Sequence, residues 1–177
     1  MSEPLFAFLR AVNLGKFNQV PMADLVKATA TEGLPPTRYL LASGNLVLDG
    51  ATPEEGLRTA IVDLIAKRYD VATAVVFRTP RELQELLKAD PFTPAGLPTV
   101  HASLWDETPD PAGLKALAGE EFGNDALHLL PDAAVMGYHS NSHTSKLTNA
   151  LIERRLKVPA TARNLNTFRR LLERFAP

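Results

Sequence analysis

The sequence contains no cysteine, and this absence excludes several kinds of chemistry at once. Disulfide frameworks, thiol nucleophiles, zinc sites built on thiolates and thiol redox switches all need a cysteine side chain. A reducing compartment suits such a chain. Aromatic residues are also few, at 7%, and no RNA-recognition aromatic motif falls on a predicted strand. A stacking platform for nucleic-acid bases is therefore not expected.

Long hydrophobic runs are missing as well. No stretch approaches the roughly 18 apolar residues of a membrane-spanning helix. The N-terminal residues Met1–Pro4 include an acidic residue and lack the basic start and cleavage site of a signal peptide. Apolar residues make up 45% of the 177, an ordinary share for a globular chain with a sizeable core. We therefore expect a cytoplasmic protein with no membrane partner.

The net charge is only −1, but the charge is distributed unevenly along the chain. Residues 146–177 contain eight basic and two acidic side chains, a net charge of +6, and residues 1–145 carry −7. Such asymmetry is typical of a basic surface for an anionic partner. The alternative is that the basic segment packs on the acidic remainder, or that it is a solvated helix face.

Apolar runs and turn signals predict the elements of the first half. Pro21 fits the first turn of a helix that ends at Gly33, and Ser43-Gly44-Asn45 predicts a hairpin turn. Thr52 and Glu55 have the spacing of a capping box. The expected elements are a strand at 5–10, a helix at 21–32, a hairpin of 39–42 and 46–48, a helix at 52–69 and a strand at 73–77.

The second half repeats this order of elements. A second capping box, Thr79 with Glu82, predicts a linking helix to Lys88, and a loop rich in proline covers 90–98. The later elements are a strand at 100–105, a helix at 110–118, a hairpin of 127–130 and 133–138, a helix at 144–156, a strand at 160–163 and a helix at 166–175.

Each half therefore follows the order β-α-β-β-α-β, which is that of ferredoxin-like folds. We predict an α+β protein of two ferredoxin-like (βαββαβ) halves packed together, with extra helices. The predicted domains are 1–79, a linking helix and loop at 80–98, and 99–177 with the C-terminal helix.

Two candidate binding segments lie in the first half. Arg10-Ala-Val-Asn13-Leu-Gly15-Lys16-Phe17-Asn18 follows a strand and precedes a helix, where binding residues often gather. It matches neither the P-loop spacing nor the glycine pattern of dinucleotide sites, and the alternative is a polar turn with Gly15 at positive φ. Ser43-Gly44-Asn45 is the other candidate, for which a purely structural hairpin turn is favoured.

Two more candidates lie in the second half. His143-Thr144-Ser145-Lys146 is predicted at a helix start, where free N–H groups favour an anion. Thr161–Thr167 enters the last helix, with Asn164 or Asn166 as a cap and Arg163 able to grip a phosphate or carboxylate. The alternatives are a solvated Lys146 beside an ordinary cap, and a salt bridge for Arg163.

Several familiar sites are missing from the sequence. His139 and His143 have i, i+4 spacing, but a turn between them argues against metal binding. No nucleophile elbow and no set of nucleophile, histidine and acid is found. We therefore expect neither metal nor cofactor, and the sequence leaves open whether the protein is an enzyme.

The four segments together carry a family resemblance. The stretches LRAVNLGKFNQVPMADL, YLLASGNLVL, FRTPRELQELLKADPF and SKLTNALIERRL…TARNLNTFRRLL resemble the bacterial domain-of-unknown-function family 1697. Ala11 and Lys16 replace glycines of the usual family pattern, and Leu165 replaces a tryptophan. A ligand that stacks on that tryptophan in other members would bind differently here.

The resemblance implies a ferredoxin-related α+β fold in two parts, with no established activity. It also implies one shared site. The polar signature of the family falls on Arg10, Asn13, Ser43, Asn45, Lys146, Arg163, Asn164, Asn166 and Thr167.

Three functions remain open on the sequence. The first is binding of a small anion, such as a phosphorylated ligand or nucleotide, by cations and amides at strand and helix ends. The second is an enzyme acting on such a ligand, with Lys146 or Arg163 stabilising charge. The third is nucleic-acid or protein binding through the basic C-terminal face, which the near-neutral total charge and the missing aromatics disfavour.

Overall fold

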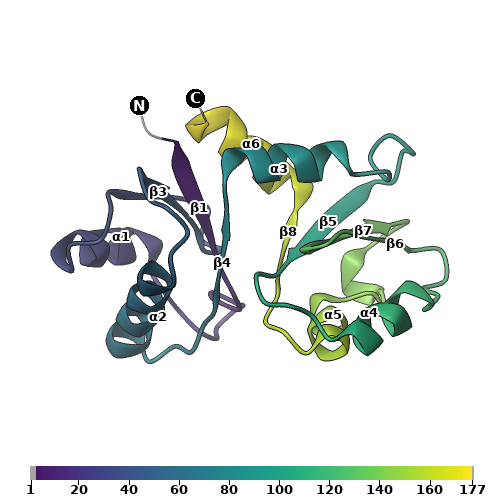
Figure 1. Ribbon diagram of the computed structural model, residues 1–177, viewed down its shortest axis with the longest axis horizontal. Helices are drawn as coiled ribbons and strands as arrows, with labels where there is room; N and C mark the ends of the chain where they lie inside the picture. The colour runs from purple at the N-terminus through teal and green to yellow at the C-terminus, as the bar shows by residue number, and fades with distance from the viewer. Residues whose placement is uncertain (1–2, 177) are drawn as a thin grey trace. The chain divides into compact units, whose positions relative to one another are not determined.

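The computed structural model describes residues 3–176, so Met1 and Ser2 of the N-terminal segment lie outside the described residues. The chain divides into two compact units (Figure 1). The first unit comprises Met1–Leu83 together with Leu171–Pro177, and the second comprises Gln84–Arg170. Each unit contains one four-stranded antiparallel sheet with helices. The predicted α+β fold in two halves is therefore confirmed, and the residue boundaries predicted for the domains stay a prediction.

The first unit has the strand order of a ferredoxin-like fold. Its elements are β1 (Pro4–Leu9), α1 (Met22–Thr31), β2 (Thr37–Leu40), β3 (Asn45–Asp49), α2 (Glu55–Tyr69) and β4 (Val75–Arg78). The sheet order is β2-β3-β1-β4, and all neighbouring pairs are antiparallel. In this order neither helix connects two strands that are neighbours in the sheet, because α1 joins β1 to β2 and α2 joins β3 to β4.

The core of the first unit lies between one face of this sheet and the two helices. Alternate residues of a strand point to the same face, so Leu5, Ala7 and Leu9 of β1 all join this core. The helices contribute Leu25 of α1 and Ile61 of α2, which are both fully buried. Burying an aliphatic side chain of this size stabilises a fold by about 2 kcal/mol.

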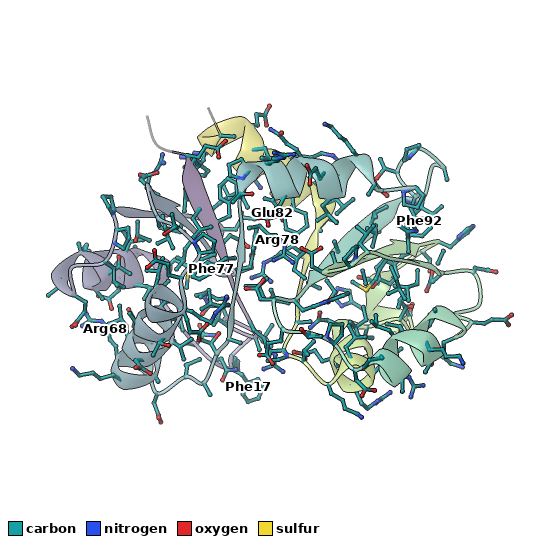
Figure 2. All side chains as sticks on the ribbon, in the orientation of Figure 1. Phe17, Arg68, Phe77, Arg78, Glu82 and Phe92 are labelled. Carbon is teal, nitrogen blue, oxygen red and sulfur yellow. The ribbon has the colours of Figure 1, made fainter. Side chains whose placement is uncertain are left out.

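A polar contact joins the two helices of the first unit. Arg68 on α2 donates two hydrogen bonds to the carboxylate of Asp24 on α1, at 2.8 and 2.9 Å, and Figure 2 labels Arg68. The hydroxyl of Tyr69 donates a third, at 2.8 Å. These bonds favour the charged carboxylate, so the pKa of Asp24 falls from its usual 3.8 to about 2, and the hydrogen bond from Arg68 is the largest cause.

We expect this contact to appear in an acid titration. Because the folded pKa of Asp24 is depressed, its contribution to stability is present above about pH 4 and is lost as the pH falls through about 2. Substitution of Arg68→Ala should return the pKa of Asp24 toward 3.8. The carboxyl chemical shift of Asp24, followed by NMR in both proteins, measures this change. An unchanged titration would show that Arg68 does not hold Asp24 in solution.

The second unit repeats the topology of the first. After β5 (Thr99–Leu104) come α4 (Pro111–Ala118), β6 (Ala126–Leu129), β7 (Ala133–Tyr138), the short 3-10 helix η1 (Ser142–Thr144), α5 (Asn149–Leu156) and β8 (Thr161–Asn164). The sheet order is β6-β7-β5-β8, again antiparallel throughout. The core on the helix side includes Trp105, Met136 and Ile152.

Two helices contain the boundaries between the units. The first boundary falls between Leu83 and Gln84 in α3 (Pro80–Lys88), and the second between Arg170 and Leu171 in α6 (Leu165–Phe175). The end of α6 belongs to the first unit, where the Arg38 guanidinium of β2 lies 4.7 Å from the centre of the Phe175 ring. A cation over an aromatic face is attracted by the ring quadrupole.

The structure confirms one predicted capping box and corrects the other. At α3 the Thr79 N–H donates to Glu82 Oε2 at 2.7 Å, and the Glu82 N–H donates to Thr79 Oγ1 at 3.2 Å. At α2 the prediction is wrong: the helix begins at Glu55 with no side-chain cap, and the Thr52 hydroxyl donates to Glu54. Within the described residues no helix is long and apolar enough to span a membrane.

The predicted helix over 144–156 begins later than expected. The segment 142–144 forms η1, and α5 begins only at Asn149, with the Thr148 hydroxyl accepting from the Leu151 N–H. Between them Ser145 is extended, because its hydroxyl donates to Asp125 Oδ2 at 2.6 Å and accepts from the Leu147 N–H at 3.0 Å. Lys146 is therefore not in the first turn of a helix.

Candidate functional site

The nine predicted site residues divide between the two units. Arg10, Asn13, Ser43 and Asn45 belong to the first, and the second contains Lys146, Arg163, Asn164, Asn166 and Thr167. In each unit the predicted segments lie beside two strands that run in the same direction, β1 and β2 in the first unit and β7 and β8 in the second. These two strands finish at the same end of their sheet. The convergence of all four segments on one site stays a prediction.

Asn13 joins the loop after β1 to the turn between β2 and β3. Its Nδ2 donates to the carbonyl oxygens of Val20, at 2.8 Å, and Ala42, at 2.6 Å. Its Oδ1 accepts from the Val20 N–H at 2.7 Å. Asn13 adopts φ +52°, a left-handed conformation that asparagine tolerates better than most residues. Its amide is therefore committed to holding the loop, and Asn13 can only position other groups.

The Ser43-Gly44-Asn45 segment is a tight turn, as the structural interpretation of the sequence predicts. Asn45 is fully buried, and its Nδ2 donates to the Leu40 carbonyl at 2.7 Å and to Ser43 Oγ at 3.1 Å. The Gly44 carbonyl accepts from the Leu9 N–H at 2.8 Å. These bonds fix the turn against the end of β1, and the exposed Ser43 stands at its surface.

The tip of the loop after β1 exposes apolar side chains. Leu14 and Phe17 exchange backbone hydrogen bonds across a tight turn, and 56% and 76% of their surfaces are exposed. Figure 2 labels Phe17. Lys16 lies between them and is also exposed. Arg10 begins the loop, with its N–H donating to the Ala74 carbonyl and its carbonyl accepting from the Thr73 hydroxyl.

In the second unit, the segment 139–148 contains the exposed Lys146. Asp125 holds this segment at two points, because its carboxylate accepts from the His139 N–H at 3.0 Å and from the Ser145 hydroxyl at 2.6 Å. The buried hydroxyl of Tyr138 donates to the Leu147 carbonyl at 2.9 Å. The backbone beneath Lys146 is thus fixed, and its side chain extends from a defined position.

Arg163 and Asn164 point to opposite faces of β8, because they are consecutive residues of one strand. The guanidinium of Arg163 donates to Thr161 Oγ1 and to the Ala162 carbonyl, both at 2.8 Å. Burial lowers the pKa of Arg163 to about 10, which still leaves it a cation at neutral pH. Arg163 and Asn164 therefore cannot both contact one small ligand that lies on a single face of the sheet.

Asn164 ends β8 and caps α6, which follows it directly (Figure 1). Its Oδ1 accepts from the Asn166 N–H at 2.9 Å, as the capping interpretation predicts. Asn166 is exposed, and its Oδ1 accepts from Arg169 at 2.8 Å. Thr167 is 9% exposed, so little of it is open to a ligand.

His101 is a candidate that the sequence analysis missed. It lies directly opposite Asn164 in the β5–β8 pair, so both side chains stand on one face of the sheet. The ring of His101 packs edge-on against Tyr138, with 5.4 Å between the ring centres. Among residues 3–176 the imidazole makes no side-chain hydrogen bond. Burial lowers its pKa, and the nearby His143 lowers it further.

His101, Asn164 and the nearby His143 lie at one end of the second sheet, and the segment that follows β7 from this end also carries Lys146. We call His101, His143, Lys146 and Asn164 the sheet-end cluster. β7 ends at Tyr138 opposite Thr99, and β8 ends opposite His101, so the segments that follow both strands start at the same end of the sheet. In the sequence His101 is a single histidine inside a predicted apolar strand. That pattern does not show which residues lie next to it in the fold.

Ion pairs within the second unit neutralise part of the positive charge of the C-terminal segment. Three basic residues of the C-terminal segment pair with acidic residues of 90–120: Arg155 with Glu120 at 2.9 Å, Lys157 with Asp110 at 3.3 Å and Arg169 with Asp90 at 3.8 Å. This is the packing of the basic segment on the acidic remainder that the sequence left open. It reduces the positive charge available to a nucleic acid.

The fold places the chain among α+β proteins that contain two successive ferredoxin-like units. The chain belongs to a family described as "Protein of unknown function (DUF1697)", whose model matches residues 3–134. The matched range includes the first two candidate segments and ends before Lys146. The family suspected from the sequence is therefore confirmed.

A solved structure supports the fold over nearly the whole chain. A conserved bacterial protein from Streptococcus pneumoniae superposes with a TM-score of 0.71 at 20% sequence identity, over 97% of each chain. At this identity the likeness supports the fold alone. No curated protein matches the chain significantly.

Proposed function

We propose that the protein binds a small anionic ligand, of the phosphate or nucleotide kind, at the sheet-end cluster of the second unit. The observation that carries this proposal is the pairing of His101 with Asn164. It places an imidazole without a side-chain hydrogen bond beside an amide at the start of α6. The same sheet end leads into the segment that carries Lys146.

The cluster offers several donors to an anion. The Oδ1 of Asn164 is occupied by the Asn166 N–H, which leaves its Nδ2 to face a ligand. Because its pKa is lowered, His101 is neutral at pH 7 and can donate one N–H or accept a proton. Lys146 adds a charge on a long, exposed side chain. Phosphate oxygens suit such a set of charged and neutral donors.

A second function, catalysis on the same ligand, is favoured by one observation. A half-buried imidazole with a lowered pKa and no side-chain partner among residues 3–176 is suited to accept a proton from a bound substrate. Under this alternative His101 is the general base, and Lys146 stabilises negative charge.

The cytoplasmic location expected from the sequence stays a prediction.

A thermal-shift experiment tests the binding proposal. Inorganic phosphate, pyrophosphate, ATP and glucose 6-phosphate are added to the protein and to the variants Lys146→Ala and His101→Ala. A ligand at about 100 times its dissociation constant stabilises a protein by about 2.7 kcal/mol. For a chain of this length the midpoint should rise by roughly 5–10 °C.

The variants decide where a ligand binds. Both cluster variants should lose most of the shift, and Lys115→Ala, which removes an exposed lysine from α4, should keep it. A shift that survives in both cluster variants and disappears in Arg163→Ala would contradict the proposal, because Arg163 faces the other side of β8. The absence of any shift with all four compounds would also contradict it.

A further inference from the structure

A groove runs along the outer edge of the second sheet and includes Asp125, whose carboxylate also holds the segment that carries Lys146. Its volume is about 540 Å³, and it lies between the end of α4 and β6, which Figure 1 shows on the same side of the unit. All four residues of β6 line it, together with Leu117 and Phe122. A hollow between a helix and a strand edge is a shape that an extended peptide can fill.

The edge of β6 presents backbone groups to this groove. β6 is the terminal strand of the sheet and pairs only with β7. The Leu130 N–H donates to the Ala133 carbonyl at 2.8 Å, and bonded positions alternate along an antiparallel pair. The N–H and C=O groups of Leu127 and Leu129 therefore point outward, and no partner for them is recorded among residues 3–176.

The side chains of β6 include neither the charges nor the prolines that often protect a free strand edge. Proteins block such edges with charged side chains, prolines, bulges or a covering segment. The sequence of β6, Ala126-Leu-His-Leu129, has neither a formal charge nor a proline, and all four residues are partly exposed. By contrast, the edge strand β2 of the first unit carries Arg38, which pairs with Asp49 at 2.5 Å.

The groove is acidic. Glu120, Glu121 and Asp125 line it, and its lining contains neither lysine nor arginine. Glu120 is engaged by Arg155, and Asp125 by Ser145, whereas Glu121 is exposed. The negative charge thus lies beside open backbone donors and acceptors, and it complements a basic side chain.

We propose that β6 binds an extended segment of a partner protein as a fifth strand of the second sheet, and that this segment alternates apolar and basic residues. The backbone groups of Leu127 and Leu129 hydrogen-bond the segment. Its apolar side chains pack on the half-buried Phe122, and its basic side chains face Glu121 and Asp125. Alternation follows from the period of two in a strand. This proposal does not depend on anion binding.

The test uses a blocked eight-residue peptide that alternates valine and lysine, with the full-length protein. Saturable binding is expected below about 1 mM, measured by fluorescence anisotropy. Hydrogen exchange of the Leu127 and Leu129 amides should slow by at least about tenfold on saturation, because both become ladder donors. A peptide that alternates valine and glutamate, and the valine–lysine peptide methylated at every backbone nitrogen, should not bind.

A charge reversal provides the matched variant. Glu121→Lys should weaken binding of the valine–lysine peptide by about fivefold, the size expected for an exposed charge pair. Glu107→Lys, which changes another exposed glutamate outside the groove, should leave binding unchanged. The proposal fails if the peptide does not bind, or binds without protecting Leu127 and Leu129. It also fails if self-association protects these amides without peptide, since a second copy would then be the occupant.

Discussion

Substitution of Gly44→Ala is expected to destabilise the protein by about 3 kcal/mol. Gly44 has φ +81°, and a Cβ at this position would lie 2.6 Å from Val12 Cγ2 and 2.8 Å from Leu9 Cβ. The left-handed conformation costs a residue with a Cβ about 1–2 kcal/mol, and forcing atoms into a packed site adds about 1–3 kcal/mol. Urea unfolding of the wild type and the variant measures the difference.

Gly15→Ala is the matched control for this substitution. Gly15 also has positive φ, at +59°, but no heavy atom lies within 4 Å of the Cβ that would be added. It should therefore show only the backbone cost, about 1 kcal/mol. Equal losses in the two variants would show that the turn at Gly44 does not lie tightly against the end of β1. The bracing role assigned to Asn13 would then lose its support.

Substitution of Gly113→Ala is expected to have an effect at least as large, in the second unit. A Cβ at Gly113 of α4 would lie 1.7 Å from the backbone oxygen of Arg155 in α5. Backbone cannot rotate away as a side chain can, so the two helices would have to separate. We expect a loss of about 3 kcal/mol or more, although alanine is favoured over glycine inside a helix by about 1 kcal/mol.

The control for Gly113 is Gly56→Ala in α2. Gly56 lies in a helix, is exposed, and has no atom within 4 Å of an added Cβ. This variant should gain stability by up to about 1 kcal/mol in thermal or urea unfolding. If Gly113→Ala also gained stability, α4 and α5 would not approach as closely as described. The groove between α4 and β6 would then have a different shape.

Local patterns in the sequence were enough to predict the fold. A short apolar run after a turn signal marked strands such as β7, and the reciprocal spacing of Thr79 and Glu82 marked the start of α3. The start of α5 could not be predicted in this way. Both Thr144 and Thr148 are residues that cap helices, and Thr148 does so because Asp125, about twenty positions away, holds Ser145 extended. No local pattern contains that contact.

The candidate site was predictable in its residue types but less so in their roles. Asn13 and Asn45 were selected as binding residues, yet their amides hold a loop and a turn. A side chain that recognises a ligand and one that recognises a nearby carbonyl look alike in a sequence. His101 was missed for the opposite reason: its partner Asn164 is supplied by strand pairing over a long sequence separation.

The position of the two unit boundaries has a consequence for synthesis. The residues Leu171–Pro177 belong to the first unit, although the whole second unit precedes them in the chain. Domains generally fold as they leave the ribosome, N-terminal ones first. Here the N-terminal sheet emerges early but receives the end of α6, including the Phe175 ring beneath Arg38, only after residues 84–170 have been made. The second unit is therefore the first that can be completed during translation.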